Sequence, residues 1–213
     1  AGQQPDLHAG GAQGADVLNG GLGADFIDGG TGTDMASWKF SSEAVTVNLE
    51  TGEASGGSAT GDIVKNIEDM EGSANFGDTL TGDSNDNRVY GRGGDDTING
   101  GGGIDRRYGE AGVDTLNGGA ENDVLLGGIG GDNLDGGDGL EDWAAYYQST
   151  AGVTVDLNLA GPQVSGGEAN GDTLVNIENV QGTNFVDILT GDALANRLYG
   201  LGDNDIIIGG GAG

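Results

Sequence analysis

Aspartates recur every nine residues through much of this chain, and each follows a short run rich in glycine. In GGAENDVLLGGIGGDNLDGG, from Gly118 to Gly137, the scheme appears twice, with Asp123 and Asp132 each followed two positions later by leucine. Glycine turns allow backbone carbonyls to point toward one spot, so carboxylate and turn together form an oxygen-rich environment. Ca²⁺ favours such a donor set, whereas Mg²⁺ requires a tighter octahedron and keeps its waters.

The repeat follows the nine-residue frame G-G-x-G-x-D-x-U-x, in which U is a large apolar residue. Asn87 and Asn196 offer a neutral oxygen at the sixth position and predict weaker sites, while Asp142 replaces Glu141 after a one-residue insertion. We predict that the following residues ligate metal: Asp16, Asp25, Asp34, Asp78, Asn87, Asp96, Asp105, Asp114, Asp123, Asp132, Asp142, Asp187, Asn196 and Asp205.

Each repeat divides into a six-residue glycine turn and a three-residue strand that buries the apolar eighth residue. Two repeats make one coil, which stacks Asp96 under Asp114 and Asp114 under Asp132. Because strands stack about 4.8 Å apart, the carboxylates form two acidic columns that repel one another without a cation. Ions between coils are expected to bind carbonyls of turn glycines as well, such as those of Gly100, Gly101, Gly118, Gly119, Gly127, Gly128, Gly130 and Gly136.

The composition also calls for a cation. There are 35 acidic residues against 7 basic ones, a net charge of −28, which disfavours binding to nucleic acid or anionic membrane and opposes compaction. About eight or more Ca²⁺ ions would offset much of this charge. The absence of cysteine and the single histidine argue against zinc, and no apolar run reaches the length of a membrane span.

Two segments that resemble each other separate the repeat blocks. DMASWKFSSEAVTVNL, from Asp34, matches DWAAYYQSTAGVTVDL, from Asp142, and GDIVKNIEDMEGS, from Gly61, matches GDTLVNIENVQGT, from Gly171. Their alternating apolar residues indicate half-buried strands. We therefore predict one continuous solenoid with a first block (1–37), an interleaved segment (38–76), a central block (77–141), a second interleaved segment (142–185) and a last block (186–213).

The frame resembles the hemolysin-type calcium-binding, or RTX, nonapeptide repeat of secreted bacterial proteins, and GGAENDVLL and GGLGADFID are close matches. The resemblance implies an all-β fold, a right-handed parallel β-roll or β-solenoid with calcium ions between stacked glycine-rich turns. It also implies secretion, with folding outside the cell. The expected function is a calcium-binding module whose ion ladder drives the folding and rigidity of a larger secreted protein.

Other functions remain open. Arg88 and Arg106 share position seven, and Tyr90 and Tyr108 share position nine, so each pair should stack and could hold an acidic, alginate-like polysaccharide. The arginines could instead neutralise nearby acids. A third alternative is an adhesin or surface-layer segment in which the solenoid acts as an extender. The motifs H-E-x-x-H and G-x-S-x-G are absent, so we expect a non-catalytic module.

Further expectations concern the core and the chain end. Arg107 occupies an apolar position, so its repeat, GGGGIDRRY, is expected to distort or turn its strand. Trp38 and Tyr146 occupy matching places in the two interleaved segments, and with Phe76 and Phe185 they are expected to fill wider parts of the core. The sequence stops at GGGAG just after a repeat begins, which suggests a piece of a longer protein.

Overall fold

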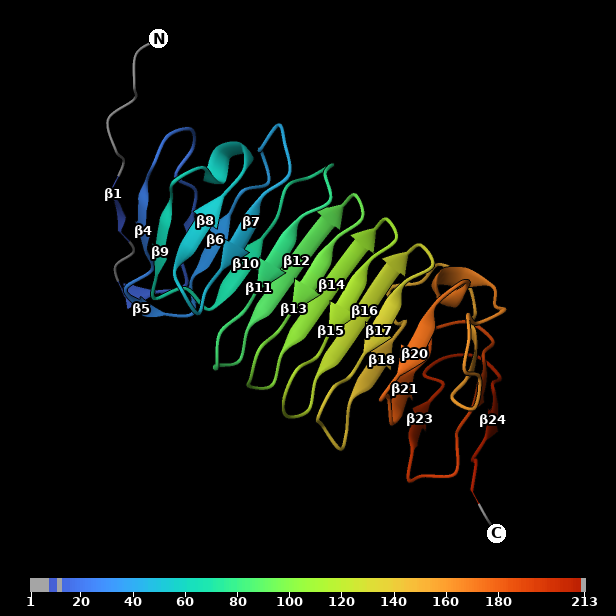
Figure 1. Cartoon of the computed structure of the whole chain (residues 1–213). Coiled ribbons are helices and arrows are strands. Elements are labelled where there is room, and N and C mark those ends of the chain that lie inside the picture. Colours follow the sequence, from blue (N-terminus) through green and yellow to red (C-terminus); the bar gives the residue numbers. More distant parts are fainter. Residues whose placement is uncertain (1–7, 11–12, 212–213) are drawn as a thin grey trace.

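Short strands stacked one beside another make up the computed structural model, which describes residues 8–10 and 13–211 (Figure 1). In spatial order, the ten-stranded sheet consists of β1 (His8–Gly10), β4 (Phe26–Asp28), β9 (Ile63–Lys65), β8 (Glu53–Ser55), β7 (Thr46–Asn48), β11 (Thr79–Thr81), β13 (Thr97–Asn99), β15 (Thr115–Asn117), β17 (Asn133–Asp135) and β20 (Thr173–Val175). The nine-stranded sheet consists of β23 (Arg197–Tyr199), β21 (Asn179–Gln181), β18 (Trp143–Ala145), β16 (Val124–Ile129), β14 (Arg106–Ala111), β12 (Arg88–Gly93), β10 (Asp69–Glu71), β6 (Met35–Ser37) and β3 (Val17–Leu18).

Smaller elements complete the described structure. A three-stranded sheet contains β19 (Thr154–Asp156), β22 (Ile188–Thr190) and β24 (Ile206–Ile208), and a two-stranded sheet contains β2 (Gln13–Gly14) and β5 (Thr31–Gly32). The helices found in residues 8–10 and 13–211 are two short 3₁₀ turns, η1 (Gly57–Ala59) and η2 (Gly167–Ala169). Neither has the length or the apolar character that a membrane crossing requires.

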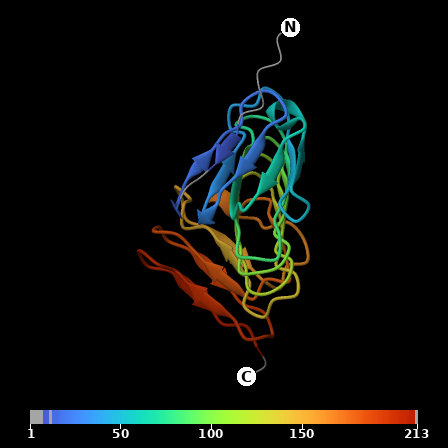
Figure 2. The ribbon, with the colours of Figure 1, turned by 90° about the vertical axis from the view of Figure 1, so that its left-hand side faces the viewer.

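Strands of the central block pair in parallel with a constant shift. Thr97 in β13 pairs with Thr115 in β15, and Arg106 in β14 pairs with Val124 in β16, so one coil contains 18 residues, or two repeats. Seen from the end of the stack, the central coils overlie one another (Figure 2). This register confirms the two-repeat coil and, with it, the all-β solenoid.

In the central block, the eighth residue of each repeat points into a core between the two long sheets. Leu80 and Ile98 from one sheet, and Val89 and Leu125 from the other, are completely buried within one apolar cluster. A three-residue strand is unstable alone, but in the stack it pairs on both sides and buries an apolar side chain. Most turns of the central block have a positive φ at their second position, which Gly101 supplies with a φ of 98°.

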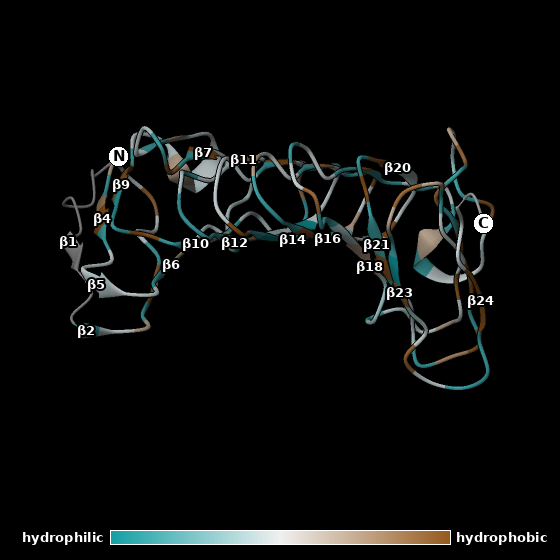
Figure 3. Ribbon diagram, turned by 90° about the horizontal axis from the view of Figure 1, so that it is seen from below, coloured by the Kyte–Doolittle hydropathy of each residue, from teal (hydrophilic) through white to brown (hydrophobic). Residues whose placement is uncertain are grey.

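The interleaved segments form longer coils, and they differ from each other. In the first, β8 pairs antiparallel with both β7 and β9, which adds a hairpin to the ten-stranded sheet. In the second, Pro162 precedes Gln163, and the Gln163 side chain replaces strand pairing: its Oε1 accepts the N–H of Asp156 at 2.9 Å. The stack is straight over the central coils and bends to one side where these segments lie (Figure 3).

The expected distortion of the strand at Arg107 is wrong. Arg107 lies within β14, pairs in register with Val89 and Leu125, and is 0% exposed. The strand stays regular, and Nη2 of the guanidinium donates to acceptors inside the coil, as described below.

The prediction for the large aromatic residues is half right. Trp38 and Tyr146 are buried in the core, as expected. Phe76 and Phe185 are 39% and 42% exposed, which contradicts the expectation that they fill the core. Both lie in turns rather than strands, and the bend of the turn directs their side chains outward.

Candidate metal centre

Backbone hydrogen bonds tie the repeat aspartates into columns. In the first aspartate column, the N–H of Asp78 donates to Asp96 Oδ1 at 2.7 Å, and the N–H of Asp96 donates to Asp114 Oδ1 at 2.8 Å. The same bond joins Asp114 to Asp132, and Asp132 to Asp172, at 2.9 Å in both cases. Each carboxylate thus holds the coil before it, which confirms the predicted stacking of these aspartates.

The second aspartate column runs through the alternate repeats. The N–H of Asn87 donates to Asp105 Oδ1 at 2.6 Å, and the N–H of Asp105 donates to Asp123 Oδ1 at 2.8 Å. Asp123 donates in turn to Asp142 Oδ1 at 2.7 Å, and Asp142 donates to Glu178 Oε2 at 3.0 Å. Asp142 therefore occupies the place in the column that the one-residue insertion predicts.

The first and last blocks contain the same kind of column, but with fewer successive carboxylates. Asp16 and Asp205, at the two ends, are only half-buried. The hydrogen bonds from backbone N–H to carboxylate are Asp16 to Asp34 (2.8 Å), Asp34 to Glu68 (2.8 Å), Asp25 to Asp62 (2.9 Å) and Asp187 to Asp205 (3.0 Å).

The second oxygen of many repeat carboxylates is buried without a hydrogen bond. An ionised carboxylate in this situation is strongly destabilising, so it requires either a proton or a cation. Among the described residues, no hydrogen-bond donor reaches the Oδ2 atoms of Asp34, Asp96, Asp114, Asp123, Asp132 and Asp142.

Glycine at the first turn position makes room for this oxygen. A Cβ on Gly109 would overlap both Asp114 Oδ2 and the carbonyl oxygen of Gly127 in the next coil. Carboxylate and carbonyl oxygens therefore converge beside this glycine. Four of the predicted carbonyl donors occupy the first turn position: Gly100, Gly118, Gly127 and Gly136. The other four lie further along their turns: Gly101, Gly119, Gly128 and the closely packed Gly130.

The donor chemistry of these places fits calcium. Nowhere in residues 8–10 and 13–211 do three acidic or histidine side chains meet at one point. An ion in the columns would therefore take a carboxylate oxygen from one side chain and most other ligands from backbone carbonyls. Ca²⁺ accepts such irregular, carbonyl-rich oxygen sets, whereas Mg²⁺ and Zn²⁺ do not favour them.

The raised pKa values show that ionised carboxylates are unfavourable in the two columns when no cation compensates them. Burial raises the pKa of Asp96 to about 8, and the neighbouring carboxylates of Asp114 and Asp78 add to the effect. Burial likewise raises the pKa of Asp105 and of Asp114 to about 7. At neutral pH the Asp96 carboxyl would largely hold its proton, and those of Asp105 and Asp114 would do so in part, unless a cation compensates the charge.

Two aspartates of the interleaved segments extend the columns, and the sequence analysis missed them. Asp62 and Asp172 each accept the N–H of a repeat aspartate, but their other oxygen has a partner. Trp38 Nε1 donates to Asp62 Oδ2 at 3.0 Å, and the Tyr146 hydroxyl donates to Asp172 Oδ2 at 3.0 Å. The available signal was the Gly-Asp pair that opens both matching stretches, GDIVKNIED and GDTLVNIEN.

The glutamates of these stretches, Glu68 and Glu178, were missed as well. Each accepts the N–H of a repeat aspartate through its carboxylate. Each also accepts through its backbone carbonyl: Asn87 Nδ2 donates to Glu68 O, and Asn196 Nδ2 donates to Glu178 O, both at 2.9 Å. The two predicted asparagine ligands therefore already have hydrogen-bond partners.

Asp78 and Asp187, which open the central and last blocks, also have partners for both oxygens. Ser73 N–H donates to Asp78 Oδ2 at 2.6 Å, and its hydroxyl donates to Oδ1 at 3.1 Å. Thr183 makes the same two contacts with Asp187, at 2.7 Å and 3.0 Å. Their carboxylates have less need of a cation than those inside the central block.

The predicted arginine and tyrosine columns are present. Arg88 pairs with Arg106, and Tyr90 pairs with Tyr108, in adjacent strands. The tyrosine rings stack with centroids 4.6 Å apart and planes 11° apart. Arg88 Nη1 lies 3.8 Å from Asp69 Oδ2, so this arginine does lie beside an acid.

The model of the RTX calcium-binding nonapeptide repeat matches the chain in four copies, at residues 11–36, 74–106, 108–139 and 181–212. The chain belongs to this RTX family. The matched ranges cover more than half of the sequence and identify it as containing calcium-binding repeats. A search of the curated proteins found no match.

Proposed function

We propose that calcium binding to the two aspartate columns drives the folding of this chain, as a rigid module of a larger secreted bacterial protein. The observation that supports the proposal most strongly is the set of buried Oδ2 atoms without a donor among the described residues. Because the turns do not persist in an unfolded chain, ion binding at these oxygens is also folding free energy. Without ions, several uncompensated buried charges oppose the fold.

The strongest sites in this proposal are those where Oδ2 and a turn carbonyl converge without another partner. They are the sites of Asp34, Asp96, Asp114, Asp123, Asp132 and Asp142. Weaker sites follow at Asp78, Asp187, Asn87 and Asn196, whose side chains already accept or donate hydrogen bonds within the chain. An affinity of about 10⁻⁴–10⁻³ M per site, as in extracellular modules, would leave the sites empty in a low-calcium cytosol.

Family membership supports the rest of the proposal. RTX repeat proteins are typically secreted, and the repeats themselves are typically non-catalytic. We therefore place this module outside the cell, where it would fold on meeting calcium and stiffen the domains attached to it.

The test is a titration of the chain with CaCl₂, and with MgCl₂ as control, followed by far-UV circular dichroism and sedimentation velocity. We expect a steep change from an expanded coil to compact β structure with calcium alone. A chain that is equally compact and β-rich in EDTA would contradict the proposal, because the aspartate columns would then not need an ion to fold.

Acidic-polysaccharide binding is a second candidate. The observation that favours it is the stacked pair Tyr90 and Tyr108 beside Arg106. The described residues provide no ion-pair partner for Arg106, whereas Arg88 lies beside Asp69. Sugar rings could lie on the tyrosines while uronate groups contact the arginines. Alginate binding that is lost in the double variant Arg88→Ala, Arg106→Ala would support this function, and the absence of binding to the unaltered chain would remove it.

A further inference from the structure

Arg107 stands at the one eighth position of the central block that carries a charged side chain. Its strand neighbours in the same register, Val89 and Leu125, are apolar, yet Arg107 is as completely buried as they are. Arginine keeps its charge in protein interiors, so a permanent cation lies inside the coil. The adjacent Arg106 points the other way and is exposed.

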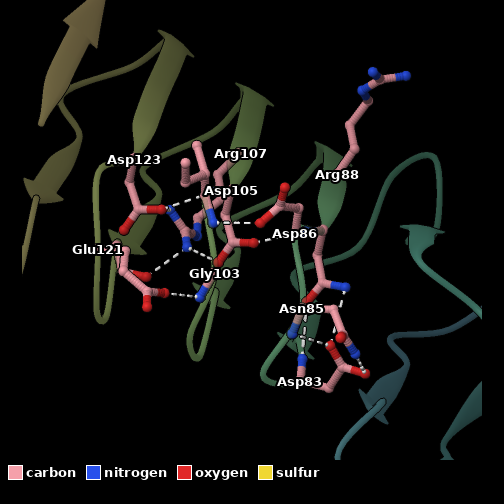
Figure 4. A network of polar contacts seen from close by, with 12 residues as sticks. Asp83, Asn85, Asp86, Arg88, Gly103, Asp105, Arg107, Glu121 and Asp123 are labelled. Atoms are coloured by element: carbon pink, nitrogen blue, oxygen red, sulfur yellow. Dashed lines mark hydrogen bonds and ion pairs between the residues drawn. The ribbon is translucent and has the colours of Figure 1, made fainter.

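The guanidinium reaches the second aspartate column. Arg107 Nη2 donates to Asp105 Oδ2 at 2.5 Å and to the carbonyl oxygen of Gly118 at 2.5 Å. Arg107 Nη1 lies 3.5 Å from Asp123 Oδ1. Figure 4 shows Arg107 between Asp105 and Asp123, whereas Arg88 extends away from the turns.

These two acceptors are the pair of oxygens that converge in the other repeats. Beside Gly109, the space that a Cβ would fill is bounded by Asp114 Oδ2 and the carbonyl of Gly127. Beside Gly100, a Cβ would overlap Asp105 Oδ2 and, in addition, Arg107 Nη2. The guanidinium nitrogen thus occupies the place in its repeat where the other repeats leave oxygens unpartnered.

We infer that Arg107 is a built-in cation that takes the place of one calcium ion in the second aspartate column. The inference rests on the proposed function of the columns. It explains why Asp105 Oδ2 has a partner, while Oδ2 of Asp114 and of Asp123 has none among the described residues. The Asp105 carboxylate is then compensated by Arg107 when calcium is removed, so the column needs no ion at this coil.

The test counts bound ions in the substitution Arg107→Leu, which restores the apolar residue typical of the eighth position. Equilibrium dialysis at saturating CaCl₂, with calcium measured by atomic emission, should show one more ion per chain than in the unaltered protein. The matched control is Arg106→Leu, which removes the same charge from the exposed neighbouring position and should leave the count unchanged. An unchanged count in a folded Arg107→Leu variant would overturn the inference.

A second pair of variants keeps the inference testable if Arg107→Leu does not fold. Asp105→Asn should bind as many ions as the unaltered chain, because no ion uses that carboxylate, whereas Asp114→Asn should bind at least one fewer. Loss of an ion in Asp105→Asn would overturn the inference. If the unaltered chain binds no calcium at all, the proposed function fails and the inference falls with it; if calcium binds but the count depends on Asp105, only the inference fails.

Discussion

The central block and the interleaved segments use the same carboxylate ladder but complete it differently. In the central block, Asp96 and Asp114 accept a backbone N–H through Oδ1, and their buried Oδ2 atoms lack a donor among the described residues. In the interleaved segments, Asp62 and Asp172 accept the same backbone bond, but Trp38 and Tyr146 supply the second hydrogen bond. Under the proposed function, one region depends on an external cation, and the other on its own aromatic side chains.

This difference divides the stability of one continuous stack between two sources. An interleaved coil buries large aromatic residues and satisfies its carboxylate internally, whereas a repeat coil buries one apolar residue per strand and leaves a charge to be compensated. Under the proposed function, the two interleaved segments flank the central block as regions that need less calcium to fold. The comparison predicts that calcium removal affects the two regions unequally.

The largest expected effect is on hydrogen exchange as calcium is lowered. Backbone amides of β13 and β15 should lose protection at a higher calcium concentration than those of β8 and β9. The strands β13 and β15 follow Asp96 and Asp114, whose Oδ2 atoms have no donor among the described residues, whereas β9 follows Asp62, whose Oδ2 accepts the Trp38 indole N–H. Exchange monitored by mass spectrometry over a series of calcium buffers measures both regions in one sample. Simultaneous loss of protection would show that the stack is a single cooperative unit and would remove the distinction.

The next effect concerns pH. The pKa of Asp96 is raised to about 8, and that of Asp114 to about 7, chiefly by burial. A carboxyl whose pKa is higher in the folded state contributes stability that is complete below its unfolded value, about 3.9, and is lost as pH rises through 7 to 8. In EDTA, lowering the pH from 9 to 5.5 should therefore increase the β signal in circular dichroism.

With saturating calcium the pH dependence should reverse in sign, because protons then compete with the ion for the same carboxylates. The melting temperature should fall as the pH is lowered over the same range. An EDTA sample that loses structure on acidification would contradict the assignment of these carboxylates as the groups that oppose calcium-free folding.

A smaller effect is expected when a side chain fills the space beside Gly109. Gly109→Ala places a methyl group where Asp114 Oδ2 and the Gly127 carbonyl converge, and overpacking of this kind costs about 1–3 kcal/mol. The calcium midpoint of folding should rise roughly 1.5-fold, because a cost of about 2 kcal/mol is shared among about eight ions and about 1.4 kcal/mol corresponds to a factor of ten for one ion. Gly161→Ala in the second interleaved segment is the control, because its Cβ would meet nothing within 4 Å. Equal midpoints for the two variants would argue against an ion beside Gly109.

An effect of similar size is expected at the aromatic donors. Tyr146→Phe removes the hydroxyl that donates to Asp172 Oδ2, which should lower the free energy of unfolding by about 1–3 kcal/mol. The number of bound calcium ions should not change. Tyr199→Phe, at a residue that is 50% exposed, serves as control and should alter neither quantity. Denaturant unfolding in calcium measures the first, and equilibrium dialysis the second.

Much of the repeat structure was accessible from the sequence because its information is local. The nine-residue period places Asp96, Asp114 and Asp132 in one column, and the insertion before Asp142 was correctly placed as well. The sequence showed Arg107 as an exception to the apolar pattern, but it did not show that the strand would stay regular, because this depends on the acceptors that the folded stack places beside Nη2. Here Asp105 Oδ2 and the Gly118 carbonyl accept its hydrogen bonds.

The amino-acid order alone specifies the coil, its apolar eighth positions and the two rows of carboxylates, because each follows from a spacing of nine residues. Which carboxylates keep an oxygen without a donor was decided only by the folded stack. Trp38 lies 24 residues from Asp62, and Tyr146 lies 26 residues from Asp172, and no repeat period relates these partners. A buried carboxylate oxygen can meet a hydrogen-bond donor, a guanidinium or neither. The outcome depends on contacts between coils of unequal length, which bring distant residues together only when the chain folds.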